Sequence, residues 1–144
     1  SVNITEVVTS LLKEYIQNSK RASEQLDIRL PHGNIWILAQ EKILIRILCN
    51  LIDNALKYST GDIMFYMWGE SEYCHIQISN PSDYISDEEL KSIFDLFYTK
   101  DEARTKSSGI GLYATRKLVI QISGDIQVNY EAGIFTVSIK LPLI

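Results

Sequence analysis

Two asparagines and a lysine stand at helical spacing in the segment NLIDNALKYS, residues 50–59. At about 100° per residue, Asn50, Asn54 and Lys57 fall within one narrow stripe of a helix. An amide oxygen is a hard, neutral ligand of the kind that Mg²⁺ accepts together with phosphates. A lysine one turn away neutralises such phosphates. A solvated helix face accounts for the same pattern, so the segment alone leaves both interpretations open.

A second chemical signal is the segment SSGIGLYATRKLV, residues 107–119. Gly109 and Gly111 flank Ile110 where a polar stretch enters a predicted helix, and glycine lets backbone N–H groups approach phosphate oxygens. The spacing is not that of a P-loop. Glycines that only allow close helix packing remain the alternative. The preceding residues, 98–108, include Lys100, Arg104 and Lys106 and predict a phosphate-binding lid that nucleotide orders.

Hydrophobic periodicity predicts the elements that must position these groups. We expect helices over residues 4–24, over 40–58, from the N-cap Ser86 through Phe97, and over 109–122. Gly61 and Gly124 mark the ends of the second and fourth helices. Strands are expected over 27–30, 35–38, 62–68, 73–79, 125–130 and 134–141. Hairpins separated by helices predict an α+β fold, a two-layer sandwich with a mixed, mostly antiparallel sheet and helices on one face, forming one domain over residues 1–144.

The composition of the chain limits the kinds of molecule that it can bind and its expected place in the cell. A formal net charge of −4 argues against general nucleic-acid binding, which needs a basic field. No apolar run approaches the roughly 20 residues that cross a bilayer, and no signal peptide is visible. We therefore expect a soluble, cytoplasmic domain.

In order, the segments NLIDNALKYS, IFDLFYTK and SSGIGLYATRKLV, closed by SGDIQVNYEAGIFTVSIKLP, resemble the catalytic domain of bacterial sensor histidine kinases. These kinases share the Bergerat ATP-binding fold with gyrase, Hsp90 and MutL ATPases, and the resemblance covers about residues 2–142. It implies ATP and Mg²⁺ as ligands, with Asn54 on the metal and Asn50 nearby. Phe94 and Phe97 match the aromatic segment before the lid. The resemblance implies these further nucleotide contacts: Lys57, Tyr58, Ser108, Gly109, Ile110, Gly111 and Leu112.

Two positions bear on the reaction. The ATPases of the superfamily carry a water-activating glutamate where this chain has Asn50, and an amide cannot take a proton from water at neutral pH. That favours phosphoryl transfer over hydrolysis. The family's Asp-x-Gly-x-Gly segment is replaced by Asn80, Ser82 and Tyr84. Asn80 can still accept a hydrogen bond from adenine, but the lost glycines must change the loop or crowd the pocket.

The resemblance implies transfer of the γ-phosphoryl group of Mg-ATP to a histidine on an adjoining dimerisation domain, and then to a response regulator. Neither His32 nor His75 suits the acceptor, which lies on an upstream helix in the family, so the chain alone should not autophosphorylate. The parent protein is expected to be a membrane-anchored homodimer. A serine kinase or ATPase of the superfamily, and a pseudokinase that serves as an interaction module, are the alternatives.

Overall fold

The computed structural model describes residues 1–95 and 111–144. Its helices are α1 (Ile4–Asn18), α2 (Lys20–Gln25), α3 (Glu41–Tyr58), α4 (Asp87–Ser92) and α5 (Tyr113–Gln121). Its strands are β1 (Val2–Asn3), β2 (Leu26–Arg29), β3 (Trp36–Ile37), β4 (Ile63–Glu70), β5 (Tyr73–Pro81), β6 (Asp125–Glu131) and β7 (Ile134–Pro142). In these residues no helix has the length and apolar character needed to span a membrane.

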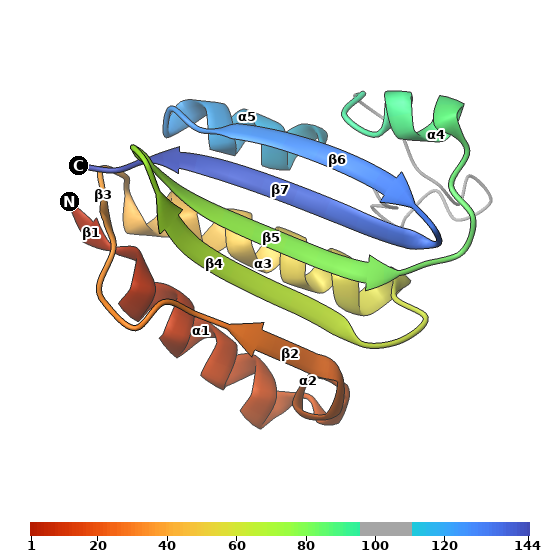
Figure 1. Cartoon of the computed structure of the whole chain (residues 1–144), viewed down its shortest axis with the longest axis horizontal. Helices are drawn as coiled ribbons and strands as arrows, with labels where there is room; N and C mark the ends of the chain where they lie inside the picture. The colour runs from red at the N-terminus through yellow and green to blue at the C-terminus, as the bar shows by residue number, and fades with distance from the viewer. Residues whose placement is uncertain (96–110) are drawn as a thin grey trace.

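The main sheet has five strands in the order β2-β4-β5-β7-β6 (Figure 1). The β2–β4 pair is parallel, and the other three pairs are antiparallel. The short strands β1 and β3 pair separately, where the two chain ends lie near each other. The expected mixed, mostly antiparallel sheet is therefore confirmed. Strand β1 was not predicted, because two residues are too few to show a periodic pattern.

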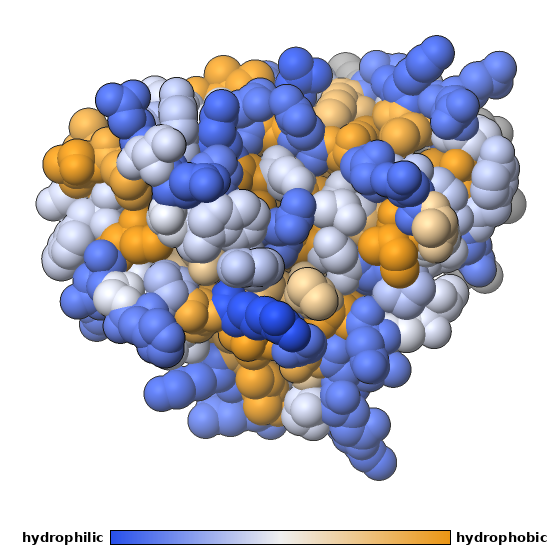
Figure 2. Space-filling model, viewed as in Figure 1, coloured by the Kyte–Doolittle hydropathy of each residue, from blue (hydrophilic) through white to orange (hydrophobic). Residues whose placement is uncertain are grey.

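The sheet has one covered face and one open face. Figure 1 shows α3 behind the central strands, between α1 and α5. Alternate residues of the strands point toward these helices and form the core with them. Figure 2 shows the open face, where hydrophilic side chains are mixed with apolar ones. The inward-facing buried residues are Ile63, Phe65, Met67, Cys74, Ile76, Ile78, Ile126, Phe135, Val137, Ile139 and Leu141.

Helix α3 has an apolar face that is almost fully buried. Six of its side chains are buried, and they are Leu44, Ile47, Leu48, Leu51, Ile52 and Ala55. The helix contacts β5 directly and lies against α1 and α5. Because 3.6 residues make one turn, this packing fixes which side of α3 can bear polar groups.

The C-terminal end of α3 is held by a guanidinium and by the end of β5. Arg21 of α2 donates hydrogen bonds to the carbonyl oxygens of Leu56 and Ser59, where the helix leaves carbonyls without partners. The backbone N–H of Thr60 donates to the Pro81 carbonyl at 2.9 Å. The last turn of α3 and the last residues of β5 are therefore brought side by side.

Three predicted helix boundaries were wrong. The first helix breaks at Ser19, which has an extended backbone and accepts a hydrogen bond from the Ala22 N–H, so that α2 starts anew. The third helix has the predicted capping box of Ser86 and Glu89 but ends at Ser92. The fourth begins at Tyr113 rather than at residue 109. Phe97 and residues 98–108 lie outside the described part of the chain.

Glycine at position 124 serves close packing rather than an unusual backbone angle. The left-handed residue after α5 is Ser123, with φ 64°. A Cβ on Gly124 would lie 2.6 Å from Leu141 Cδ2 and 2.9 Å from the Lys140 carbonyl oxygen. The turn therefore lets β7 pass directly beneath the end of α5. Gly61 also lies beyond the helix end that it was predicted to mark, because α3 ends at Tyr58 with Ser59 as its C-cap.

We predict that Arg21→Ala lowers the free energy of unfolding by about 1–3 kcal/mol, because two carbonyls at the end of α3 lose a charged donor. Chemical denaturation followed by circular dichroism measures the change. Arg29→Ala is the matched control, since Arg29 pairs with Asp27 at 3.9 Å and both side chains are more than half exposed. Equal stability of the two variants would show that Arg21 does not hold α3.

Candidate nucleotide site

The polar stripe of α3 faces the start of α5 across a cavity of about 300 Å³. Gly111, Leu112, Ala114 and Thr115 line one side of the cavity. The other side is formed by four residues of α3, which are Asn50, Asp53, Asn54 and Lys57. The structure thus brings together Asn50, Asn54 and Lys57, which were predicted from the sequence, with Gly111 and Leu112 of the predicted glycine segment.

The position of α5 is fixed by Leu112, which precedes its first turn. The Leu112 side chain is buried, and its N–H donates to the Ile93 carbonyl at 2.8 Å. Its own carbonyl accepts from the Arg116 N–H at 2.9 Å. These bonds hold the start of α5 at the cavity. A helix N-terminus offers N–H groups and a partial positive charge, which suit an anion.

Asn50 is oriented by a residue that sequence reasoning missed. Its amide nitrogen lies 3.4 Å from the Thr115 hydroxyl, and Thr115 is only 3% exposed. An amide that donates to Thr115 through Nδ2 leaves Oδ1 for another partner. Thr115 lies inside the segment 107–119 and in the first turn of α5, but nothing local in the sequence links it to Asn50.

Lys57 and Tyr58 lie at the last turn of α3. Lys57 is exposed, and its Nζ stands 5.3 Å from the centre of the Tyr58 ring. The Tyr58 hydroxyl is buried and has no hydrogen-bond partner among the described residues. Buried polar atoms are nearly always paired, so this hydroxyl is a candidate contact for the nucleotide that the resemblance implies at Tyr58.

Asn80 lies at the end of β5, on the covered face of the sheet. It is 3% exposed, and its Nδ2 donates to the Pro81 carbonyl at 3.0 Å. It does not line the cavity between α3 and α5. The Thr60–Pro81 hydrogen bond nevertheless places the β5 end beside the end of α3 that carries Tyr58.

The segment that replaces the family's two glycines does not need them. No residue from Ser82 to Tyr84 has a positive φ. Tyr84 is 73% exposed and meets the Tyr130 ring edge-on, with ring centres 6.2 Å apart. The side chain therefore extends into solvent rather than into the protein interior.

Three predicted phosphate-contact residues, Ser108, Gly109 and Ile110, lie outside the residues that the structure describes. The same holds for the basic residues of the predicted lid. Their roles stay predictions. His75 is described and lies on β5 with its ring stacked on Trp68 at 5.0 Å, on the open face of the sheet and away from α3.

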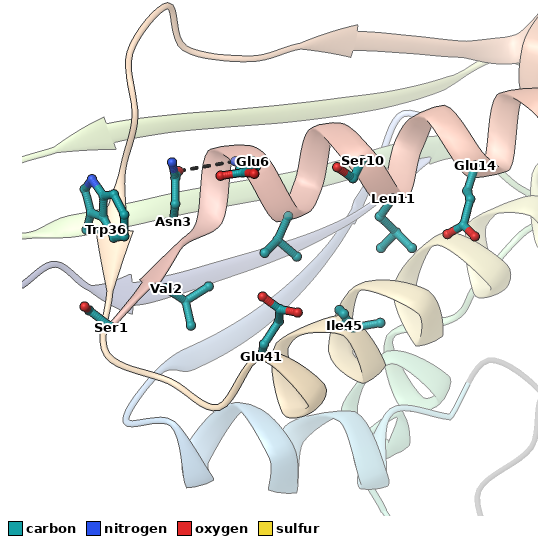
Figure 3. Close-up of a pocket in the computed structure, with 11 residues that line it drawn as sticks. Ser1, Val2, Asn3, Glu6, Ser10, Leu11, Glu14, Trp36, Glu41 and Ile45 are labelled. Atoms are coloured by element: carbon teal, nitrogen blue, oxygen red, sulfur yellow. Dashed lines mark hydrogen bonds between the residues drawn. The ribbon is translucent and has the colours of Figure 1, made fainter.

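A larger cavity, of about 460 Å³, lies between α1 and the start of α3 (Figure 3). Val2, Leu11 and Ile45 contribute apolar side chains to it, and Asn3 is engaged in capping the N–H of Glu6 at 3.3 Å. Its lining includes the carboxylates Glu6, Glu14 and Glu41, and neither a lysine nor an arginine is among the described residues that form it. This charge repels phosphates, so the smaller cavity is the better candidate.

The residues around the smaller cavity fit a nucleotide with Mg²⁺. The described residues contain no group of three His, Cys, Asp or Glu side chains that could enclose a metal. Mg²⁺ does not need such a cage, because it keeps several waters and takes phosphate oxygens as ligands. Two amides and one carboxylate supply oxygen atoms to the lining of this cavity, and Lys57 supplies positive charge.

Comparison with known proteins agrees with this geometry. Residues 39–144 match the family described as histidine kinase-, DNA gyrase B-, and HSP90-like ATPase. The sensor histidine kinase YcbM of Bacillus subtilis is 27% identical over 96% of this chain and 47% of its own length. The sensor protein DltS of Streptococcus agalactiae is 30% identical over 76% of this chain and 29% of its own length. The chain therefore spans about half or less of these relatives.

A solved structure shows the same fold. The mycobacterial sensor histidine kinase MprB superimposes with a TM-score of 0.80 at 21% identity, covering 99% of this chain and 95% of that one. The family match includes α3 and α5, whose residues line the cavity, and the strands β4 to β7. The chain belongs to the histidine kinase-, DNA gyrase B- and HSP90-like ATPase family, as a catalytic ATP-binding domain of the sensor histidine kinase type.

Proposed function

We propose that the chain binds Mg-ATP between α3 and α5 and transfers the γ-phosphoryl group to a histidine on a dimerisation domain of its parent protein. The observation that carries the proposal is the cavity in which Asn50, Asn54 and Lys57 face Gly111 and Leu112. Mg²⁺, when bound, neutralises phosphate charge. Asn54 would provide an oxygen to it, and Lys57 would offset the remaining negative charge.

Phosphoryl transfer depends mainly on positioning and charge neutralisation, so the protein needs few reactive groups. Asn50 stands where hydrolytic relatives carry a glutamate, and an amide is no general base. The Thr115 contact holds that amide in place. Both features favour a protein acceptor over water and disfavour the ATPase alternative.

A response-regulator aspartate would then receive the phosphoryl group, as the relation to sensor kinases suggests. We propose a homodimeric, membrane-anchored parent with this domain in the cytoplasm. We propose that neither His32 nor His75 is the acceptor. His75 is stacked on Trp68 on the open face of the sheet, away from a phosphate held between α3 and α5. The chain alone should therefore lack autophosphorylation.

The second candidate is a pseudokinase, and one observation favours it. Asn80, Ser82 and Tyr84 replace the segment that holds adenine in the family. Two observations weaken this alternative. The Tyr84 side chain is exposed and does not fill the protein interior, and the backbone of residues 82–84 needs no glycine conformation. Calorimetric titration with a non-hydrolysable ATP analogue and Mg²⁺ separates the two, since a pseudokinase of this kind would release no binding heat.

We predict that Asn54→Ala reduces Mg²⁺-dependent nucleotide affinity by at least about tenfold, or 1.4 kcal/mol, because the metal loses a ligand oxygen. Asn54→Asp keeps the oxygen and should retain metal-dependent binding. Calorimetry with and without EDTA measures both. Asn18→Ala, at the exposed end of α1, is the control and should bind as the unaltered chain does. Full affinity in a folded Asn54→Ala protein would remove Asn54 from the site.

We also predict that the chain incorporates no acid-labile phosphate from γ-labelled ATP by itself. Adding the dimerisation domain of the parent protein should produce phosphohistidine on that domain, because the acceptor is then present. The Asn54→Ala chain mixed with the same domain should give no label. Mass spectrometry that found phosphohistidine at position 32 or 75 would contradict the proposal.

A further prediction concerns adenine. Asn80→Ala should weaken ATP binding by about 1 kcal/mol, or roughly fivefold, and should reduce the preference over GTP, because a neutral hydrogen bond to the base is lost. Asn80→Asp offers a charged acceptor and should tighten binding. Ser79→Ala is the control, since Ser79 faces the open side of the sheet and bonds Thr136 at 2.9 Å. Unchanged base preference in both Asn80 variants would show that Asn80 does not contact adenine.

A further inference from the structure

A tyrosine of α1 is bonded to a carboxylate at the candidate nucleotide cavity. The Tyr15 hydroxyl donates to Asp53 Oδ1 at 2.7 Å, and the two residues are 38 positions apart in the chain. Asp53 is exposed and lines the cavity together with Asn50 and Asn54. Tyr15 is half-buried and belongs to a different groove, between α1 and α3. Asp53 therefore connects α1 to the cavity.

Helix geometry places Asp53 at one edge of the polar stripe. Relative to Asn50, Asp53 is rotated by about 60° to one side and Asn54 by about 40° to the other. The bond to Tyr15 shows that the Asp53 edge is the one that faces α1. The carboxylate and the two amides thus border the same space from neighbouring directions.

The hydrogen bond leaves Asp53 with capacity for other partners. Burial raises the pKa of Tyr15 well above its usual value, and hydrogen bonding with Asp53 adds to the effect. The phenol is therefore a donor over the whole physiological range. An ionised carboxylate can accept about four hydrogen bonds, and Tyr15 occupies only part of this capacity.

Waters bound to Mg²⁺ are suitable donors for the remaining acceptor positions of Asp53. This ion dehydrates reluctantly, so in nucleotide sites it keeps several waters. Metal-bound waters donate hydrogen bonds, and nearby carboxylates accept them and hold the ion electrostatically. The same negative charge repels a nucleotide that arrives without metal.

We propose that Asp53 accepts hydrogen bonds from waters of the Mg²⁺ that accompanies the nucleotide, and that Tyr15 is a positioning residue that holds Asp53 for this purpose. The inference rests on the proposed function of the cavity. It gives α1, through Asp53, an influence on the metal requirement of nucleotide binding. A bond that merely joined α1 to α3 would affect stability and leave the metal requirement unchanged.

The test measures binding of a fluorescent ATP analogue to this chain while the Mg²⁺ concentration is varied. Asp53→Asn should raise the Mg²⁺ concentration for half-maximal binding by roughly tenfold. Binding in EDTA should be equal or tighter, because a negative charge has been removed. Tyr15→Phe keeps the ring and should give a smaller increase in the same direction. Glu14→Gln, the neighbouring carboxylate on α1, should give none.

The double variant Tyr15→Phe/Asp53→Asn separates positioning from structural support. If Tyr15 acts through Asp53, the double variant should require no more Mg²⁺ than Asp53→Asn alone. If the double variant instead showed the combined increase in Mg²⁺ requirement of the two single variants, Tyr15 would not act through Asp53. An unchanged Mg²⁺ requirement in Asp53→Asn would overturn the role of Asp53.

The Asn54→Ala variant keeps this test distinct from that of the proposed function. If Asn54→Ala abolishes metal-dependent binding and Asp53→Asn does not alter it, only the present inference is wrong. If the unaltered chain binds no nucleotide at any Mg²⁺ concentration, the proposed function is wrong and this inference falls with it.

Discussion

Helix α3 has to bury one face against the sheet while it presents amides, a carboxylate and an ammonium on another. Six buried aliphatic side chains fix its rotation. A rotation by one residue, about 100°, would carry polar groups into the core, where each unpaired amide costs about 1–3 kcal/mol. The packing of the apolar face therefore determines where Asn50, Asn54 and Lys57 point. Every other part of the candidate site is arranged around that direction.

The ends of the neighbouring elements adjust to α3. Arg21 satisfies carbonyls at its last turn, and the Thr60–Pro81 hydrogen bond holds the end of β5 beside it. Buried Leu112 sets the start of α5 through its bond to Ile93. In this way the C-terminal turn of a helix, the end of a strand and the N-terminal turn of another helix meet. Such a junction offers both a positive helix end, at the start of α5, and a buried polar residue, Asn80, at the end of β5.

Charge distinguishes the cavity between α1 and the start of α3 from the cavity between α3 and α5 more clearly than size does. The larger one has three carboxylates around an apolar floor, and the smaller one balances Asp53 against Lys57 and adds neutral amides. A phosphate group with a divalent cation suits the second arrangement. Asn50 restricts the chemistry further, because the position offers a hydrogen-bonding amide and no base.

The sequence by itself determined the α+β class, the order of the long helices and strands, and the stripe of Asn50, Asn54 and Lys57. These features follow from local periodicity, which a single helix or strand expresses without its neighbours. The sequence could not show that Ser19 divides the first helix, because the amphipathic pattern over residues 4–24 does not reveal a side chain that caps a new turn. Only the tertiary structure decided that Thr115 orients Asn50 and that Tyr15 reaches Asp53. These contacts join residues 65 and 38 positions apart, so they depend on how α1, α3 and α5 pack and not on any pattern within one of them.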